Sequence, residues 1–204
     1  MKKLITTLVI TVALSLPGSP ATGDLRPVTP VSTPESIGLV QWLSDYKKAQ
    51  TLLEEQAAAA AEAEAQEEAR QEALTLNTVR LNEAVGLVTE RVNNTRYVFS
   101  GSTPRGWDCS GLVKWMYEEL GVPLEHRASK QQYAGRAVEH PKLGDVVVFK
   151  YNGRDSSYHV GIYLYPDTMV HAGGGRGDTT QIVSISKFAG KHSEVTFRRI
   201  IETH

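Results

Sequence analysis

The sequence is poor in cysteine, in long apolar runs and in net charge. Cys109 is the only cysteine among 204 residues, so no disulfide can form within the chain. The N-terminal run from Leu4 to Leu16 contains no charged residue, but its thirteen positions are fewer than the roughly twenty that a helix needs to cross a bilayer. The net charge of −1 does not indicate a nucleic-acid binder or a strongly anionic surface. The fold must therefore rest on burial of apolar side chains.

The first residues are typical of a secretory signal peptide. Two lysines follow Met1, the run Leu4 to Leu16 comes next, and small residues and prolines follow it. We expect residues 1–23 to be removed, with cleavage near Ala21 to Gly23, and no stable membrane insertion afterwards. Because no cysteine lies near that point, a lipoprotein anchor is excluded. The expected location is secreted or associated with the cell wall.

Two segments of biased composition follow. Residues 24–34 contain three prolines and small polar residues, which indicates a linker. Residues 35–76 are rich in alanine and glutamate and predict a helical, acidic stalk. Between Thr51 and Glu72, seven Glu stand against one Arg, a net of −6. A solvated spacer is the favoured interpretation, and a coiled-coil surface for a protein partner is the alternative, although sustained heptads are missing.

Residues 77–204 predict one α+β domain. Large apolar residues return at helical spacing from Leu74 to Val92, a second helix is expected after Cys109, and Arg127 to Ala134 predicts a short polar helix. Runs with strand character come afterwards and predict an antiparallel meander. These runs are Asp145–Tyr151, Tyr158–Tyr165, Thr168–Ala172, Ile182–Ile185 and Glu194–Ile201.

Cys109 lies at the predicted start of a helix. Turn-forming residues precede it, and apolar residues follow at helical spacing from Leu112 to Leu120. A lone cysteine is most often a small buried hydrophobe. The free N–H groups and dipole of a helix N-terminus stabilise a thiolate, however, so this position favours a nucleophile with a lowered pKa.

A nucleophilic thiol needs a base, and two of the six histidines are suited to that role. His159 and His171 each lie in a predicted strand among apolar neighbours, and a turn at Pro166-Asp167 would place their strands side by side. The other four lie in polar or terminal segments. A zinc site that includes His126 is disfavoured, because no closely spaced pair of ligands occurs.

The chain carries four short motifs in a fixed order. They are Asp108 to Val113, Leu143-Gly144-Asp145, His159 to Tyr163 and Val170-His171-Ala172. Their order and spacing resemble those of the NlpC/P60 cysteine peptidases, a papain-like group that cuts the peptide stems of bacterial peptidoglycan. The likeness covers about residues 78–201.

The resemblance implies a papain-like α+β fold and a Cys-His-His site. Cys109 would be the nucleophile, His159 the general base and His171 the polar group that orients the base. The implied reaction is hydrolysis of stem-peptide bonds through a thioester intermediate. The implied partner is peptidoglycan, and neither a nucleic acid nor a metal or other cofactor is expected.

The resemblance further implies that Tyr97, Asp108 and Ser110 contact the substrate. Two departures from the family pattern lie near the expected groove. Ser100-Gly101-Ser102 replaces a double glycine, and Leu124-Glu125-His126-Arg127 replaces Leu-Pro-Arg-Thr. The specificity therefore stays open. Also open are a catalytically idle wall-binding or scaffold protein that works through its helical segment, and an amidase or acyltransferase of the same superfamily.

Overall fold

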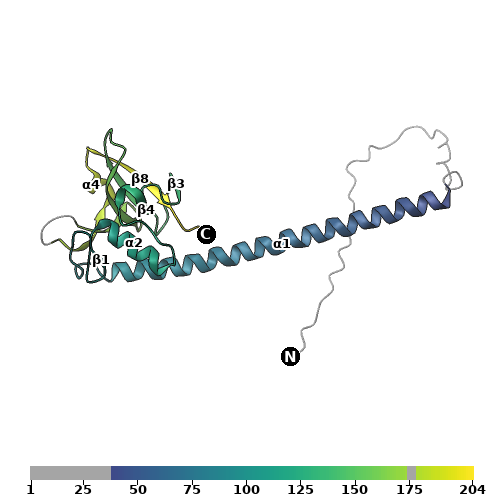
Figure 1. Cartoon of the computed structure of the whole chain (residues 1–204), viewed down its shortest axis with the longest axis horizontal. Coiled ribbons are helices and arrows are strands. Elements are labelled where there is room, and N and C mark those ends of the chain that lie inside the picture. The colour runs from purple at the N-terminus through teal and green to yellow at the C-terminus, as the bar shows by residue number, and fades with distance from the viewer. Residues whose placement is uncertain (1–37, 174–177) are drawn as a thin grey trace, which may run out of the picture. The chain divides into compact units, whose positions relative to one another are not determined.

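The computed structural model describes residues 38–173 and 178–204 (Figure 1). The chain divides into two units, Met1–Gln56 and Ala57–His204. The predicted signal peptide and proline-containing linker lie outside the described residues. Over the described ranges, no helix has both the length and the apolar character that a membrane crossing requires.

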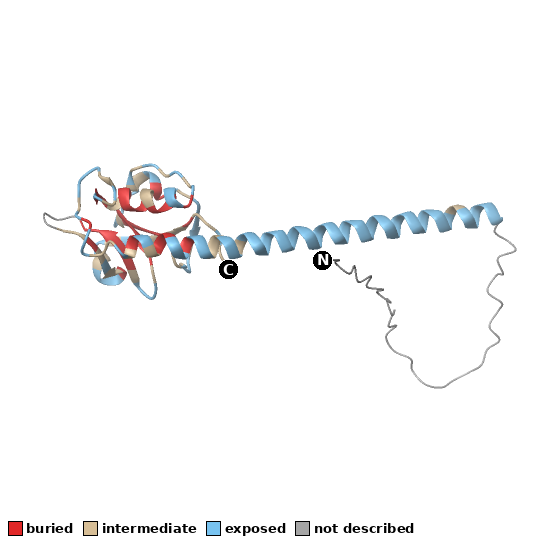
Figure 2. Cartoon of the chain, turned by 90° about the horizontal axis from the view of Figure 1, so that it is seen from below, coloured by how far each residue is buried: buried red, intermediate tan, exposed pale blue. Residues whose placement is uncertain are grey.

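Helix α1 (Leu39–Thr89) is the longest element, and it is continuous. Its alanine-rich and glutamate-rich middle explains why it forms without packing partners, since both residues favour the helix intrinsically. Most of its side chains are exposed, and buried positions occur only near its C-terminal end, at Leu81, Ala84, Val85 and Val88 (Figure 2). The stalk and the first domain helix predicted from the sequence are thus one helix. The domain boundary at residue 77 falls inside it and stays a prediction.

The core of the second unit is a six-stranded antiparallel sheet with the order β3-β8-β4-β5-β6-β7. The strands are β3 (Arg136–Val138), β4 (Val146–Tyr151), β5 (Ser157–Tyr163), β6 (Thr168–Ala172), β7 (Thr180–Ser184) and β8 (Ser193–Arg199). A two-stranded hairpin of β1 (Ser102–Thr103) and β2 (Gly106–Trp107) lies outside this sheet. The α+β class predicted from the sequence is confirmed.

The predicted simple meander is correct for β4 to β7 and wrong for the last strand. β8 does not extend the sheet beyond β7 but pairs with β4, from Val146 opposite Arg198 to Tyr151 opposite Ser193. The chain can return across the sheet because a short helix, α4 (Ile185–Ala189), separates the two strands. The sequence had assigned Ile185 to a strand. In the structure, the Ser184 side chain accepts a hydrogen bond from the Lys187 N–H and caps this helix instead.

Alternate residues of β4 divide the core into two layers, as the two-residue period of a strand requires. Val146 and Val148 pack with helix α2 (Cys109–Glu119) and the buried end of α1. Val147 and Phe149 pack on the opposite face with Ile185 and Phe188 of α4. Figure 1 shows α2 against the sheet, so the N-terminus of α2 is held beside the strands that carry the two candidate histidines.

Candidate active site

Helix α2 begins at Cys109, as the sequence predicted. Asp108 is the N-cap, with extended backbone angles (φ −92°, ψ −178°), and its side chain accepts a hydrogen bond from the Gly111 N–H at 2.7 Å. The Asp108 N–H itself donates to the Gly101 carbonyl oxygen at 3.0 Å, which ties the helix start to the turn before β1. The nucleophile candidate thus occupies the first turn of a capped helix.

The Asp108 carboxylate is the centre of a hydrogen-bond network. Its Oδ1 accepts from the Ser110 hydroxyl at 2.9 Å, besides Gly111, and lies 3.0 Å from His126 Nε2. Its Oδ2 accepts from the Ser100 N–H at 3.0 Å. Asp108 and Ser110, both predicted to contact substrate, are buried and held together. His126 was set aside by the sequence reasoning because its segment has no periodic pattern, and only its departure from the family motif marked the position.

Gly111 is required by a close approach between α2 and the preceding turn. A Cβ at this position would lie 1.9 Å from the Gly101 carbonyl oxygen and 2.9 Å from His126 Nε2. No side chain fits in that space, and the turn reaches the helix only because position 111 has none. Gln131 of α3 (Ala128–Gln131) supports the same turn of α2, because its Nε2 donates to the Ser110 carbonyl oxygen at 2.9 Å.

The Cys109 thiol is partly buried where α2 meets β5. Burial is the largest influence on it and raises its pKa, and the negative charge of Asp108 acts in the same direction. The backbone N–H groups of Val160, Ser110 and Cys109 oppose this by stabilising the thiolate. The lowered pKa expected from the helix N-terminus is therefore wrong for the unliganded site, because desolvation of the sulfur outweighs the N–H groups. The thiol is protonated at neutral pH.

His159 and His171 lie on the neighbouring strands β5 and β6, as predicted. Ile162 pairs with Val170 across these strands, and Nε2 of His159 lies 2.8 Å from Nδ1 of His171. Both side chains are buried, and Phe188 of α4 packs on both rings, with centroids 4.8 Å and 5.0 Å away. No sequence pattern predicts this contact of Phe188 with the two imidazoles.

Burial controls the protonation of both rings. It lowers the pKa of His159 to about 3, with a further lowering by His171 and an opposing effect of the Asp108 charge. It lowers the pKa of His171 to about 4, against the raising effects of the Asp178 charge and the Ala172 carbonyl group. Both imidazoles are neutral at pH 7, so each carries one N–H and one lone pair.

Tyr97 lies close to the same helix start. Its N–H donates to the Asp178 carbonyl oxygen at 2.9 Å, and it forms an isolated parallel bridge with Trp107, two residues before Cys109. Burial raises the pKa of its phenol, and negative charge on Cys109 and Asp108 raises it further.

The structure brings the predicted residues together in two groups. Asp108 and Ser110 flank Cys109 at the start of α2, where Tyr97 forms a bridge with Trp107, and His159 pairs with His171. The groups meet at β5, because the Val160 N–H that faces the sulfur follows His159 directly in the chain. Within the described residues, no hydrogen bond joins the thiol to either imidazole.

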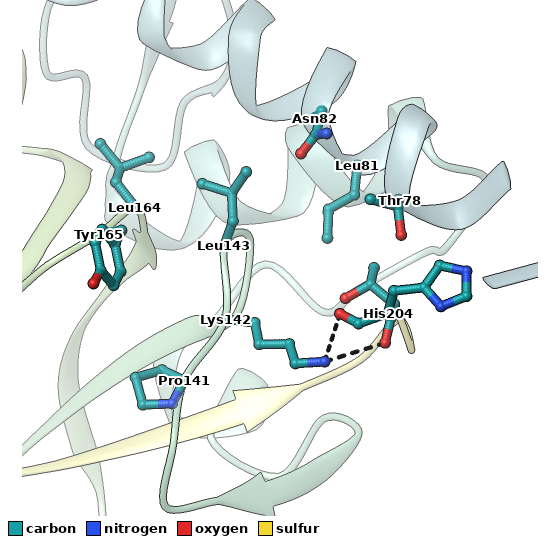
Figure 3. Close-up of a pocket in the computed structure, with 10 residues that line it drawn as sticks. Thr78, Leu81, Asn82, Pro141, Lys142, Leu143, Leu164, Tyr165 and His204 are labelled. Atoms are coloured by element: carbon teal, nitrogen blue, oxygen red, sulfur yellow. Dashed lines mark hydrogen bonds between the residues drawn. The ribbon is translucent and has the colours of Figure 1, made fainter. Parts of the chain in front are cut away.

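A separate pocket of about 420 Å³ contains none of these residues. It lies between α1 and the segment before β4, and its lining includes Leu81, Leu143 and Tyr165 (Figure 3). Lys142 reaches across it and donates to the carbonyl oxygens of Thr203 and His204. The pocket therefore has no place in the chemistry of Cys109.

Comparison with known proteins identifies the fold and the site motifs. The model of the NlpC/P60 family matches residues 94–200, which include every predicted site residue. The chain belongs to the NlpC/P60 family. The resemblance inferred from the four motifs is confirmed, and the match extends from before Tyr97 to the end of β8.

Individual relatives match only parts of the chain. A probable endopeptidase of Mycobacterium tuberculosis is 40% identical over 78 residues, which are 37% of this chain and 19% of the relative. The Escherichia coli protein named murein DD-endopeptidase MepS/murein LD-carboxypeptidase is 39% identical over 80 residues, 38% of this chain and 42% of the relative.

A solved structure shares the same domain. NlpC1 from Trichomonas vaginalis superposes with a TM-score of 0.51 and 27% identity, covering 57% of this chain and 42% of that protein. In each of these three comparisons, the match spans less than half of the relative's own length.

Proposed function

We propose that this NlpC/P60 chain is a cysteine endopeptidase that hydrolyses peptide bonds in the stem peptides of bacterial peptidoglycan. One observation carries the proposal: Cys109 lies at the start of a capped helix, beside the strand that bears His159. On the next strand, Nδ1 of His171 lies 2.8 Å from Nε2 of His159. The names of the mycobacterial and Escherichia coli relatives support it. They do not agree on one bond, so no single bond is assigned.

The reaction starts from a neutral thiol and a neutral imidazole. The Cys109 thiol transfers its proton to His159, and the thiolate attacks the carbonyl carbon of the peptide bond. The neighbouring His171 ring holds the orientation of the His159 ring through the contact between Nε2 of His159 and Nδ1 of His171. N–H groups at the start of α2, including that of Cys109, donate to the oxyanion of the tetrahedral intermediate.

The leaving group and the acyl group depart in two steps. His159 returns its proton to the leaving amine, and the acyl group stays on the sulfur as a thioester. A water molecule, deprotonated by His159, then hydrolyses the thioester and restores the thiol. Tyr97, Asp108 and Ser110 bind the substrate, and the fixed Asp108 carboxylate is suited to a positively charged amino group of the stem peptide.

We also infer that the chain is exported to the cell wall. The N-terminal lysines, the thirteen-residue apolar run and the small residues after it support a signal peptide. The helical stalk then serves as a spacer or as a surface for a protein partner. Its exposed apolar residues, among them Leu39, Trp42 and Leu53, are compatible with the second role.

The test compares the purified chain with two variants on isolated peptidoglycan. Released fragments are identified by mass spectrometry for the wild type, Cys109→Ala and His192→Gln, the last replacing an exposed histidine outside the site. We expect stem-peptide fragments from the wild type and His192→Gln, and none from Cys109→Ala. Absence of fragments from all three proteins argues for the idle scaffold. Products released by an amidase or acyltransferase reaction would replace the endopeptidase assignment.

A further inference from the structure

The ring of His171 has one nitrogen that the site described above leaves unexplained. Its Nδ1 is paired with His159, but its Nε2 is buried and has no hydrogen-bond partner within the described residues. An unpaired buried polar atom costs about 1–3 kcal/mol, so such atoms are uncommon and call for a physical reason.

The state of this nitrogen is linked to the basicity of His159. A neutral imidazole has one N–H and one lone pair, so the hydrogen bond between the rings has two arrangements. If His159 Nε2 donates, His159 Nδ1 keeps its lone pair and can accept the thiol proton. His171 Nδ1 is then the acceptor, and the His171 proton must be on Nε2.

The opposite arrangement is unproductive. If His171 Nδ1 donates, His159 Nε2 is the acceptor and the proton of His159 is already on Nδ1. His159 then has no free lone pair for the thiol, and His171 Nε2 has a bare lone pair. Only a proton on the buried Nε2 of His171 leaves His159 ready as a base.

Asp178 provides negative charge beside His171. Asp178 lies against the end of β6, where the Gly173 N–H donates to the carbonyl oxygen of the next residue, Thr179, at 3.1 Å. A Cβ at Gly173, two residues after His171, would lie 2.8 Å from Asp178 Cβ and 3.1 Å from its Oδ2. The backbone of Asp178 is fixed as well, since its carbonyl oxygen accepts from the Tyr97 N–H.

The effect of this charge is visible in the electrostatics of His171. After burial, which lowers the pKa of the ring, the Asp178 charge is the next largest influence and raises it. The same negative potential stabilises a proton on the nitrogen that is not shared with His159. The Ala172 carbonyl group acts in the same direction.

Resting on the function proposed above, we propose that Asp178 is a positioning residue that keeps the His171 proton on Nε2 and thereby leaves His159 Nδ1 free to accept the thiol proton. The proposed effect of Asp178 on the thiol proton runs through His171. The glycine at position 173 allows the carboxylate to approach.

The test reads the tautomers directly. The full chain is labelled with ¹⁵N-histidine, and the ring nitrogens of His159 and His171 are assigned by long-range ¹H–¹⁵N NMR at pH 7. The variants are Asp178→Asn, which removes the charge, Asp178→Glu, which keeps it, and Asp155→Asn, which changes an exposed aspartate in the β4–β5 connection. Activity on stem peptides is measured in parallel.

The wild type, Asp178→Glu and Asp155→Asn are expected to show the proton on Nε2 of both rings. Asp178→Asn is expected to shift His171 toward the Nδ1–H form and to lower kcat at least about tenfold with KM unchanged, since a general base contributes about 10²–10⁴-fold. If Asp178 had only a structural role, Asp178→Asn would lower the melting temperature without moving the ring signals.

Two results overturn the inference. One is an Nδ1–H tautomer of His171 in the wild type, which needs no variant to fold. The other is unchanged ring signals in Asp178→Asn. Because the ring signals do not require turnover, an inactive wild type with the expected tautomers would count against the proposed function alone.

Discussion

The imidazoles of His159 and His171 meet edge to face, with ring centroids 4.9 Å apart, planes at 77° and nitrogens 2.8 Å apart. They lie in the buried part of a sheet, where charge is costly. The two rings are therefore neutral, and one of them can accept a proton. Their neutral, buried state affects the stability of the fold as well as catalysis.

The stability of the fold should fall at acid pH because of these rings. An unfolded histidine has its ordinary pKa near 6.5, whereas burial lowers the folded pKa to about 3 for His159 and about 4 for His171. Between these values the unfolded chain binds protons that the folded chain does not. The contribution of the two rings to the free energy of unfolding is thus fully present above about pH 6.5. Below this pH it decreases by about 1.4 kcal/mol per pH unit for each ring.

Urea unfolding at pH 7.5, 6 and 5 measures this dependence. The variant His171→Asn removes one of the two rings and should reduce the slope of the free energy of unfolding against pH. Equal slopes for the wild type and His171→Asn would show that the buried ring at position 171 is not the cause.

Two glycine-to-alanine changes should act in opposite directions. Gly111→Ala places a Cβ 1.9 Å from the Gly101 carbonyl oxygen, and overpacking of this kind costs about 1–3 kcal/mol. Gly86→Ala meets no atom within 4 Å in α1 and should stabilise the fold by about 0.5–1 kcal/mol, because alanine favours the helix. Thermal unfolding of both variants gives the comparison. A stabilising Gly111→Ala would mean that the turn does not press on α2.

The Asp145–Arg199 ion pair should be a strong structural contact without a catalytic role. Both side chains are buried, and Asp145 Oδ2 accepts from Arg199 Nη2 at 2.8 Å. Replacing Asp145 by Ala leaves a buried unpaired charge and should cost about 3–5 kcal/mol of unfolding free energy. The double variant Asp145→Leu/Arg199→Met should lose less than the sum of the two single losses. If the loss of unfolding free energy in the double variant equals the sum of the two single losses, the two side chains are not coupled.

Asp108 should have separable structural and binding roles. Asp108→Asn keeps an acceptor for the Gly111 N–H but sets its amide NH2 against the Ser100 N–H. It should therefore lose less stability than Asp108→Ala, which removes the cap as well and should cost at least about 1 kcal/mol. Both variants lose the charge that we assign to substrate binding, so both should raise KM. Denaturant unfolding and steady-state kinetics on a stem peptide measure the two effects. An Asn variant as unstable as the Ala variant would mean that the charge itself holds the helix start.

The position of Cys109 could be predicted from the sequence, because Asp108 at the cap and the apolar residues after it have local causes. That the strands of His159 and His171 are neighbours could also be predicted, since the Pro166-Asp167 turn allows only a tight connection between them. The pairing of β8 with β4 could not be predicted, because the return across the sheet depends on long-range packing and no local residue specifies it.

His126 and Asp178 were missed for a related reason. Each lies in a polar or glycine-rich segment without periodicity, and its proximity to the site depends on long-range packing that no local residue specifies. The raised pKa of the Cys109 thiol was missed because a helix N-terminus is visible in the sequence but the burial of the sulfur is not.

The most direct measurement of the central claim is the mass of the intact protein during turnover. The chain is mixed with a stem peptide, quenched in acid within the first turnovers, and analysed by mass spectrometry with peptide mapping. We expect a mass increase equal to the acyl part of the substrate, located on Cys109 and absent from Cys109→Ala. Substrate hydrolysed at the wild-type rate by Cys109→Ala, or an acyl group found on another residue, would contradict the role of this sulfur.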